Sequence, residues 1–491
     1  MSLIALLELY QAVEPYLPAI FTTLALTASV LTSYHVLLTR REPGSSIAWM
    51  ALVWLAPLVG VAVYLMLGIN RIRRRAKSLG SIHSPSAEPD LVDPIVPEDI
   101  ADEACDHAGH LAPLVGLVDE VVDRPLLPGA RLTPLFDGDE AYPAMLEAID
   151  GATKSITLVS YIFDNDETGR RFVRSLEAAT HRGVEVRVLI DAAGLRYTFP
   201  SIMGRLKRAK IPCARFLPSI IPPHIMTMNL RSHRKIMVVD GRTGFTGGIN
   251  IRRHHVLNDH PPHPTRDLHF KVEGPVVAHL QEVFCDDWQF TTSEELKGPD
   301  YFPPLPPVGT SLARGITDGP DEDLDKLRLT IKGAIASAHH SIRIATPYFI
   351  PDPPMVAMLN VAALRGVLVD IILPQSNNLP FVHWASMAHL GPLLERGCRI
   401  HFTPPPFDHS KLMVVDRSWI LCGSANIDPR SLRLNFEFNV ECWDCELASR
   451  LDEFLQSRID EARELSLDDH EGRSRFFKLR DSTAALLSPY L

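Results

Sequence analysis

The chain has 491 residues, of which 46% are hydrophobic, and a formal net charge of −10. This length accommodates two or three domains. The negative charge argues against a general nucleic-acid binder, which usually carries a basic face. The seven cysteines are scattered and odd in number, so we expect reduced thiols in a cytoplasmic domain rather than a disulfide framework.

Two apolar segments near the N-terminus, residues 16–38 and 47–68, are each long enough to cross a hydrocarbon core of about 30 Å as a helix that rises about 1.5 Å per residue. We therefore predict a two-helix transmembrane hairpin within residues 1–77 and no cleaved signal peptide. Basic residues follow the second segment: Arg71, Arg73, Arg74, Arg75 and Lys77. By the positive-inside rule they predict a multi-pass protein with its remaining domains in the cytoplasm. They would also attract anionic lipid headgroups.

Residues 78–127 are rich in Pro, Asp and Glu and are predicted to form a linker. A pattern of helices and strands then occurs twice. The first copy predicts helix, strand, helix and strand at 145–152, 155–163, 169–182 and 184–190. The second copy predicts the same order at 327–339, 341–349, 355–365 and 367–373, and an amphipathic helix is expected at 446–464. This alternation indicates a layered α/β fold, with one lobe at 128–305 and another at 306–491.

A short polar motif occurs once in each copy. The first reads His233-x-Lys235, then Asp240, Gly247-Gly248 and Asn250; the second reads His409-x-Lys411, then Asp416, Gly423-Ser424 and Asn426, at the same spacing. This agreement is very improbable by chance and indicates one site built from two halves. Apolar residues follow each lysine, so we expect buried strands on which the His and Lys, two residues apart, point to the same face.

An imidazole beside an ammonium group suits the chemistry of a phosphodiester. Lysines 235 and 411 and the amides of asparagines 250 and 426 would hold the non-bridging oxygens, where preorganised donors stabilise developing charge. One histidine can attack phosphorus while the other donates a proton to the leaving alkoxide. Asp240 and Asp416 stand at odd spacing from the His and Lys. We therefore expect them to face away from the site and to pair with basic groups behind it.

The duplicated motif resembles the phospholipase D superfamily, and the stretches 345–352, 423–431 and 434–439 resemble bacterial cardiolipin synthases. The resemblance implies duplicated α/β/α lobes of the phospholipase D type, related by a pseudo-twofold axis, with both histidines in one site. It implies that His233 is the nucleophile, which forms a phosphohistidine, and that His409 is the general acid and base. Asp267 and Glu437 occupy the family's places for a carboxylate that orients a histidine.

The chain departs from the family pattern at Ser232, where Asn or Asp often precedes the first histidine, and at Thr265, where Trp is common. It also contains a histidine-rich segment with His254, His255, His260 and His263. Such a cluster can bind zinc, but the family chemistry needs no metal, so we expect an exposed loop. We expect no cofactor.

The resemblance implies a phosphatidyltransferase. One phosphatidylglycerol would be attacked, glycerol would leave, and a hydroxyl of a second phosphatidylglycerol would resolve the phosphohistidine to give cardiolipin. The expected setting is the bacterial inner membrane, with phosphatidylglycerol and anionic lipid as partners, no nucleic acid, and the question of a homo-oligomer open. A phospholipase D-type hydrolase that releases phosphatidic acid, or a transferase with another alcohol acceptor, remains an alternative, since acceptor choice depends on site shape and exclusion of water. A nuclease or a non-catalytic scaffold is disfavoured by the charge, the apolar segments and the two intact motifs.

Overall fold

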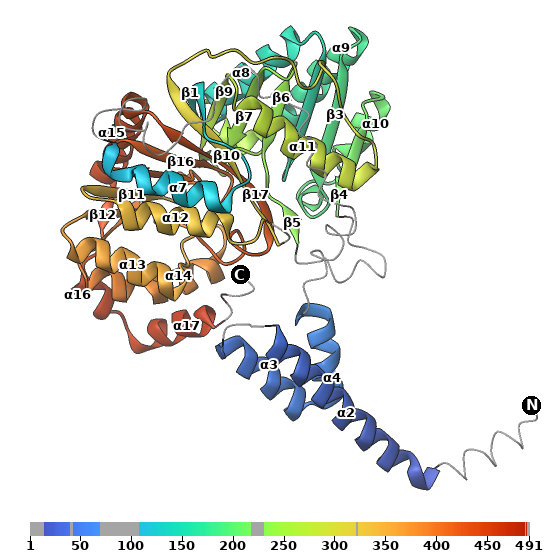
Figure 1. Ribbon diagram of the computed structural model, residues 1–491, viewed down its shortest axis with the longest axis vertical. Helices are drawn as coiled ribbons and strands as arrows, with labels where there is room; N and C mark the ends of the chain where they lie inside the picture. The colour runs from blue at the N-terminus through green and yellow to red at the C-terminus, as the bar shows by residue number, and fades with distance from the viewer. Residues whose placement is uncertain are drawn as a thin grey trace, which may run out of the picture. The chain divides into compact units, whose positions relative to one another are not determined.

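The computed structural model describes residues 14–39, 43–68, 108–217, 230–320, 323–486 and 488. The chain forms two compact units. One comprises Met1–Arg75 with Ile220–Met228, and the other comprises Ala76–Ser219 with Asn229–Leu491. The first holds the N-terminal apolar helices, and the larger second unit holds both copies of the repeated motif (Figure 1).

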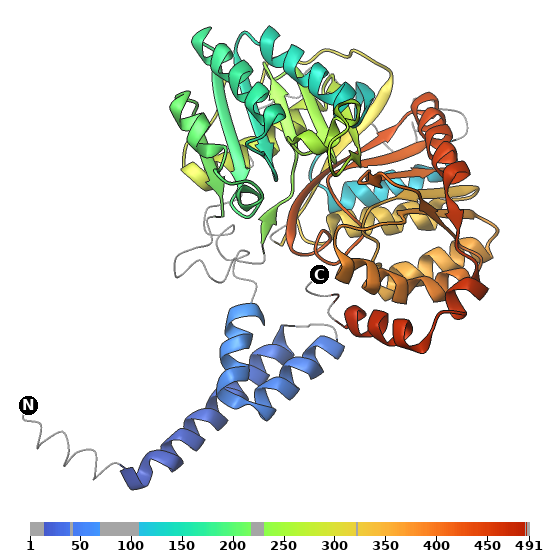
Figure 2. The same cartoon turned by 180° about the vertical axis from the view of Figure 1, so that it is seen from behind.

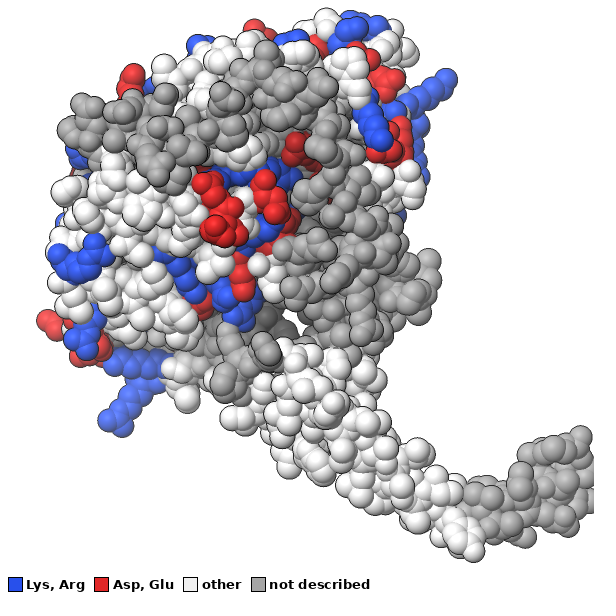
Figure 3. Space-filling model, viewed as in Figure 1, with Lys and Arg blue, Asp and Glu red and all other residues white. Residues whose placement is uncertain are grey.

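The N-terminal unit is a small cluster of apolar helices. After a 3₁₀ turn at Glu14–Tyr16 come α2 (Leu17–Leu38), α3 (Pro43–Leu55), α4 (Pro57–Val63) and a π-helical turn at Tyr64–Gly68. Val36, Trp49, Val53 and Tyr64 form its buried core, and the described residues on the face that Figure 3 shows are uncharged. The stretch Glu14–Leu38 is long and apolar enough to cross a membrane.

The second predicted transmembrane segment is not one helix, which corrects the sequence-based expectation. It breaks at Ala56, where φ is −139° and ψ is 71°. Pro57 explains the break because proline has no N–H and disfavours the helical conformation at the residue before it. A Cβ on Gly60 would lie 2.4 Å from the Leu52 carbonyl oxygen, so α4 approaches α3 closely. At about 1.5 Å per residue, neither α3 (13 residues) nor α4 (7 residues) crosses a hydrocarbon core alone.

The larger unit contains two lobes with the same order of elements. In the first lobe these are β1 (Leu127–Phe136), α8 (Asp137–Gly151), β2 (Ser155–Ser160), α9 (Glu167–His181), β3 (Glu185–Asp191), α10 (Met203–Arg208), β4 (Cys213–Phe216), β5 (Arg231–Ser232), β6 (Ile236–Val239), β7 (Thr243–Gly247), β8 (Thr265–Arg266), β9 (Leu268–Glu273) and α11 (Val277–Thr292). The predicted helices and strands of this copy are confirmed to within a few residues, except that α8 begins earlier than expected.

The second lobe repeats the pattern and adds two C-terminal helices. Its elements are β10 (Ser311–Asp318), α12 (Lys326–Ser337), β11 (Ser341–Ala345), α13 (Pro353–Leu364), β12 (Leu368–Pro374), α14 (Pro380–Leu394), β13 (Arg399–Thr403), β14 (Phe407–Asp408), β15 (Leu412–Val415), β16 (Trp419–Gly423), β17 (Asn435–Trp443), α15 (Cys445–Glu461), β18 (Arg463–Glu464), α16 (Leu467–Glu471) and α17 (Arg475–Ala485). The repeat is visible in local detail, because Asp166 and Asp352 each cap the following helix through a backbone N–H three residues on.

One mixed sheet runs through both lobes, in the strand order β18-β13-β12-β11-β15-β16-β17-β10-β1-β9-β7-β6-β2-β3-β4. Strands β1 and β10 are antiparallel neighbours in its middle, so the two half-sheets join edge to edge there (Figure 1, and from behind in Figure 2). Helices α11 and α15 pack on the sheet in their respective lobes. Each lobe keeps its own apolar core, which indicates that the shared sheet joins two separately packed layers.

The end of the predicted linker is structured. Residues 78–107 lie outside the described residues, whereas α7 (Ala112–Val121) packs against α12 of the second lobe. Leu114, Val115 and Val118 of α7 are fully buried in that lobe's core. The helix therefore ties the start of the larger unit to its second half.

The cysteines differ in part from the expectation. Cys445 is disulfide-bonded, so the prediction of reduced thiols is wrong for this residue. Free cysteines are found at 213, 285, 398, 422 and 442. Cys442 and Cys445, which have CxxC spacing, therefore do not pair with each other.

Candidate active site

Each motif histidine directly follows a short strand that pairs with the opposite lobe. Residues 233–235 are extended between β5 and β6, and residues 409–411 lie between β14 and β15. The predicted strands thus begin one residue after each lysine, which corrects the expectation that His and Lys lie within them. The reason is a change of pairing partner: β5 pairs with β17 of the second lobe, and β14 pairs with β8 of the first.

Backbone hydrogen bonds between the two lobes extend from these paired strands to the histidines themselves. The His233 N–H donates to the Phe436 carbonyl at 2.9 Å, and the His409 N–H donates to the Arg266 carbonyl at 2.8 Å. Each acceptor stands one residue before a carboxylate, Glu437 or Asp267. The geometry therefore places each histidine beside the acid of the opposite lobe.

The side chains form two crossed histidine–carboxylate pairs. His233 Nδ1 lies 3.1 Å from both carboxylate oxygens of Glu437, and His409 Nδ1 lies 2.7 Å from Asp267 Oδ2. A carboxylate at Nδ1 favours the tautomer with its proton there and leaves Nε2 to meet a substrate. The sequence identified both acids as orienting groups but did not indicate that each serves the other lobe's histidine.

The two carboxylates are held differently. Glu437 accepts hydrogen bonds from Ser424 Oγ at 2.6 Å and from Asn435 Nδ2 at 3.0 Å. In the first lobe Gly248 stands at the place of Ser424, and a Cβ there would lie 2.0 Å from Asp267 Oδ1. The shorter acid therefore requires glycine where the longer acid uses a serine hydroxyl.

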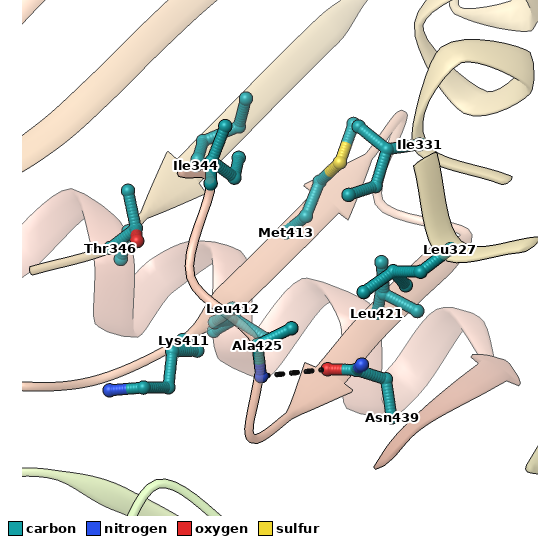
Figure 4. Close-up of a pocket in the computed structure, with 12 residues that line it drawn as sticks. Leu327, Ile331, Ile344, Thr346, Lys411, Leu412, Met413, Leu421, Ala425 and Asn439 are labelled. Carbon is teal, nitrogen blue, oxygen red and sulfur yellow. Dashed lines mark hydrogen bonds between the residues drawn. The ribbon is translucent and has the colours of Figure 1, made fainter. Parts of the chain in front are cut away.

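Both motif lysines have buried stems and ammonium groups at the site. Lys235 and Lys411 each donate to the backbone carbonyl of the histidine two residues before. A small cavity of about 30 Å³ lies behind the second motif, with apolar walls that include Met413 and Leu421, and Lys411 stands at one edge (Figure 4). The lysine therefore packs its methylene groups against the core while its charged end stays at the site.

Burial dominates the titration of the site. It lowers the pKa of the His233 imidazole to about 4 and that of His409 well below its usual range. It also lowers the pKa of Lys235 to about 7 and that of Lys411 to about 8. Buried groups lose hydration of their charged form, and these four are close enough that each positive charge disfavours the others. An anionic phosphodiester placed among them would reverse that penalty.

The pKa values of the two acids shift in opposite directions, although burial acts on both in the same way. Burial raises the pKa of Asp267 to about 6, although Lys411 opposes the shift. Burial would also raise the pKa of Glu437, but His233 and Lys235 together hold it below its ordinary value. Glu437 is therefore ionised at neutral pH beside a neutral His233.

The motif asparagines lie at equivalent turns after β7 and β16. Asn250 Oδ1 accepts the Ile162 backbone N–H at 3.1 Å, and Asn426 Nδ2 donates to Ser431 Oγ at 3.2 Å. The side-chain oxygen of Asn426 is buried and has no hydrogen-bond partner. Asn250 thus ties the end of β2 to the motif turn, and its role toward a substrate stays a prediction.

Asp240 and Asp416 lie at the far ends of the motif strands, away from the histidines. Asp240 accepts the backbone N–H groups of residues 153–155. Asp416 does the same for residues 339–341 and also contacts His110 Nε2 at 2.6 Å. Their main partners are therefore backbone amides rather than the expected basic groups. The reason is that the turns before β2 and β11 each present three N–H groups to one carboxylate.

Aromatic residues that the sequence reasoning did not assign also line the histidines. The Tyr161 ring lies 5.1 Å from the His233 ring, and the Tyr348 ring lies 6.3 Å from the His409 ring. Lys235 Nζ is 5.7 Å from the Tyr161 centroid, within cation–π range. Tyr161 directly follows β2 and Tyr348 lies three residues after β11, but the repeat pairs Tyr161 with Pro347, so the alignment of the two copies gave no signal for them.

The histidine-rich segment is only partly as expected. His255 is 2% exposed, its Nδ1 lies 3.2 Å from the Thr265 carbonyl, and its ring is 6.4 Å from that of His409. The expectation of an exposed loop is therefore wrong for this residue. Among the described residues, no group of three or more His, Cys, Asp and Glu side chains is arranged to hold a metal ion.

The sequence and fold have close relatives. The family model "Cardiolipin synthase, PLD-like domain" matches residues 145–288 and 331–459, and "Phospholipase_D-nuclease N-terminal" matches residues 27–68. The chain is 32% identical over 482 residues to the cardiolipin synthase of Geobacillus thermodenitrificans, covering 96% of this chain and 94% of that protein. It is 29% identical over 458 residues to the major cardiolipin synthase of Bacillus subtilis, covering 92% and 95%.

A solved structure shares the fold at lower identity. The phosphatidylserine synthase of Haemophilus influenzae superposes with a TM-score of 0.61 at 15% sequence identity, covering 77% of this chain and all of that one. This likeness supports the duplicated α/β architecture, and the sequence matches support the activity. The chain therefore belongs to the cardiolipin synthases, phosphatidyltransferases of the phospholipase D superfamily.

Proposed function

We propose that this chain condenses two phosphatidylglycerol molecules into cardiolipin and glycerol through a phosphatidyl-histidine intermediate. The observation that carries the proposal is the pair of crossed hydrogen bonds, His233 to Glu437 and His409 to Asp267. It gives two imidazoles whose Nε2 atoms are left for one substrate. A double displacement needs this pair, one histidine to bond phosphorus and one to move protons.

In the first step, the Nε2 lone pair of His233 attacks the phosphorus of the donor lipid. The P–O bond to glycerol breaks, and His409 protonates the departing glycerol oxygen. The low pKa of His233 supports its role, because the free base is available at neutral pH. His409 must enter this step protonated, and the anionic phosphate supplies the negative charge that restores its proton. Glu437 stabilises the positive charge that develops on His233.

In the second step, His409 removes the proton from the terminal hydroxyl of a second phosphatidylglycerol. That oxygen attacks phosphorus, the P–N bond to His233 breaks, and cardiolipin leaves. Lys235 and Lys411 hold the non-bridging oxygens through both steps, with assistance from Asn250 and Asn426. Water in place of the lipid hydroxyl would give phosphatidic acid, so exclusion of water decides between transferase and hydrolase.

The proposed setting is the bacterial inner membrane, with the catalytic lobes in the cytoplasm and phosphatidylglycerol taken from the surrounding bilayer. Support comes from the helix Glu14–Leu38, which is long enough to span, and from the basic residues at 71–77. We propose no nucleic-acid partner and no metal, because the acid–base pairs account for both steps.

The test uses the full chain reconstituted in phosphatidylglycerol vesicles. Mass spectrometry of the products should find cardiolipin and free glycerol in equal amounts. His233→Ala and His409→Ala should each abolish turnover, while His181→Ala, on the exposed surface of α9, serves as the matched control. Phosphatidic acid without cardiolipin would instead establish the hydrolase, and full activity in either motif variant would refute the shared site.

A further inference from the structure

Helix α17 presents apolar side chains to solvent. Phe476 and Leu479 are 72% and 69% exposed, and Leu486, immediately after the helix, is 79% exposed. Their spacing places them on one side of the helix. The opposite side is buried, with Asp481 and Ala484 at 1% and 3% exposure, and packs against α14. The amphipathicity of α17 is therefore inverted, since its apolar stripe faces outward.

Two cations flank this stripe. Neither Arg475 nor Lys478 forms an ion pair or a side-chain hydrogen bond with another described residue, whereas Arg473 and Arg480 both bind Asp481, at 2.6 Å and 2.7 Å. Figure 3 shows basic side chains at the lower left edge of the larger unit, where Figure 1 places α17. The outer face of α17 thus combines large apolar groups with positive charge that no described acid neutralises.

The same helix is connected to the active site through a short chain of contacts. Ala484 of α17 belongs to a buried cluster with Ile350 and Val382, and Tyr348 packs against that cluster. The ring of Tyr348 lies 6.3 Å from that of His409, and its hydroxyl donates to Asn378 just before α14 at 2.7 Å. The buried side of α17 is therefore linked by packing, through Tyr348, to the His409 side of the site.

We propose that the outer face of α17 docks the catalytic lobes on an anionic bilayer, as a membrane contact separate from the N-terminal helices. Phe476, Leu479 and Leu486 enter the interface between headgroups and acyl chains, and Arg475 and Lys478 meet lipid phosphates. A bilayer fits better than a protein groove because the flanking charge is unneutralised and the substrate is itself an anionic lipid. For the identity of that substrate the proposal rests on the proposed function.

The experiment compares one enzyme on two physical forms of its substrate. Cardiolipin formation by the full chain is measured on phosphatidylglycerol vesicles and on dispersed short-chain phosphatidylglycerol below its micelle concentration. Phe476→Ser/Leu479→Ser should raise the apparent KM on vesicles by about tenfold or more and leave the rate on dispersed substrate unchanged. Arg475→Gln/Lys478→Gln should raise the apparent KM on vesicles at low salt by about fivefold for each charge removed.

A matched control distinguishes docking from a general loss of apolar surface. Val361→Ser/Leu364→Ser on α13 removes side chains of similar exposure, 55% and 67%, and should behave as the wild type. Unchanged KM on vesicles for the α17 variants, or an equal loss with the control, would overturn the proposal. An equal loss on both substrate forms would also overturn it, as would a change in oligomeric state showing that the stripe meets a second copy.

A readout independent of activity separates this proposal from the proposed function. Backbone amides of residues 475–486 should exchange hydrogen more slowly when the full chain is in phosphatidylglycerol vesicles than in phosphatidylcholine vesicles. If the wild type makes no cardiolipin from either substrate form, the proposed function fails. The difference in hydrogen exchange between the two kinds of vesicle then still tests whether α17 docks on an anionic bilayer. Equal exchange in the two vesicles would overturn the docking proposal.

Discussion

Replacing Asp267 by asparagine should impair one catalytic step more than the other. Asp267 Oδ1 accepts the Leu268 backbone N–H at 2.9 Å, and Oδ2 meets His409 Nδ1 at 2.7 Å. In Asp267→Asn the amide oxygen should keep the backbone N–H, so the NH₂ group faces His409. The imidazole would then carry its proton on Nε2. In this tautomer Nε2 could no longer accept the proton of the attacking lipid hydroxyl. Donation to the leaving glycerol would still need the imidazolium, which an amide stabilises less than a carboxylate does.

The size of the effect follows from the lost charge. For charge centres about 4 Å apart at an effective dielectric constant of about 20, the attraction between a carboxylate and an imidazolium is about 4 kcal/mol. This value is an upper limit, and a loss of about 2 to 4 kcal/mol corresponds to a decrease in kcat of about 30-fold to about 1,000-fold. The lost tautomer adds to the second step only, so the phosphatidyl-enzyme should accumulate.

The assay follows covalent lipid on the protein and cardiolipin in the vesicles over time. Asp267→Asn should show a burst of glycerol and stable covalent lipid, followed by slow cardiolipin release. Asp150→Asn, on the exposed side of α8, is the matched control. Wild-type kcat in Asp267→Asn, or equal slowing of glycerol and cardiolipin release without covalent lipid, would refute the reasoning.

Three further predictions follow from the same geometry. On dispersed substrate, kcat/KM should fall as pH rises through about 7 to 8, because Lys235 and Lys411 lose their protons in this range; a flat profile up to pH 9 would contradict the assignment of phosphate contacts. Gly248→Ser should abolish activity in the same product assay, since its Cβ would lie 2.0 Å from Asp267 Oδ1, while Gly151→Ser, where a Cβ meets nothing within 4 Å, should retain it. Asp416→Asn should lower the free energy of unfolding in urea by about 1–3 kcal/mol at pH 7, because three backbone amides lose a charged acceptor. The pKa of Asp416 lies below its ordinary value of 3.8, so its stabilisation is present above that pH and is lost as pH falls, and a deficit that persisted at pH 2 would exclude this cause.

The repeated elements and the site residues were predictable because local signals specify them. Apolar runs after Lys235 and Lys411 predicted β6 and β15, and the capping acids Asp166 and Asp352 recur at matching places. The duplicated motif indicated one site built from two halves, and the family resemblance implied that both histidines meet in it. These signals are short-range, so one sequence without an alignment carries them.

The crossing of the pairs was not predictable, since it depends on which strands meet in space. No local sequence signal indicates that β5 pairs with β17 of the other half-sheet. The contact between Glu437 and His233 follows from that pairing and was therefore not predictable either. The break at Ala56 was missed because hydropathy dominated the reading of residues 47–68, although Pro57 was a visible signal. The burial of His255 likewise depends on packing across the lobes.

The identity of the covalently modified residue tests the central claim most directly. His409→Ala, incubated with phosphatidylglycerol vesicles, quenched in base and digested, should yield a peptide with a phosphatidyl group on His233, because attack needs only the first histidine while resolution needs the second. The same treatment of His233→Ala should yield no adduct. An adduct on His409 would reverse the roles, and the absence of any adduct in His409→Ala under conditions where the wild type makes cardiolipin would contradict the covalent mechanism.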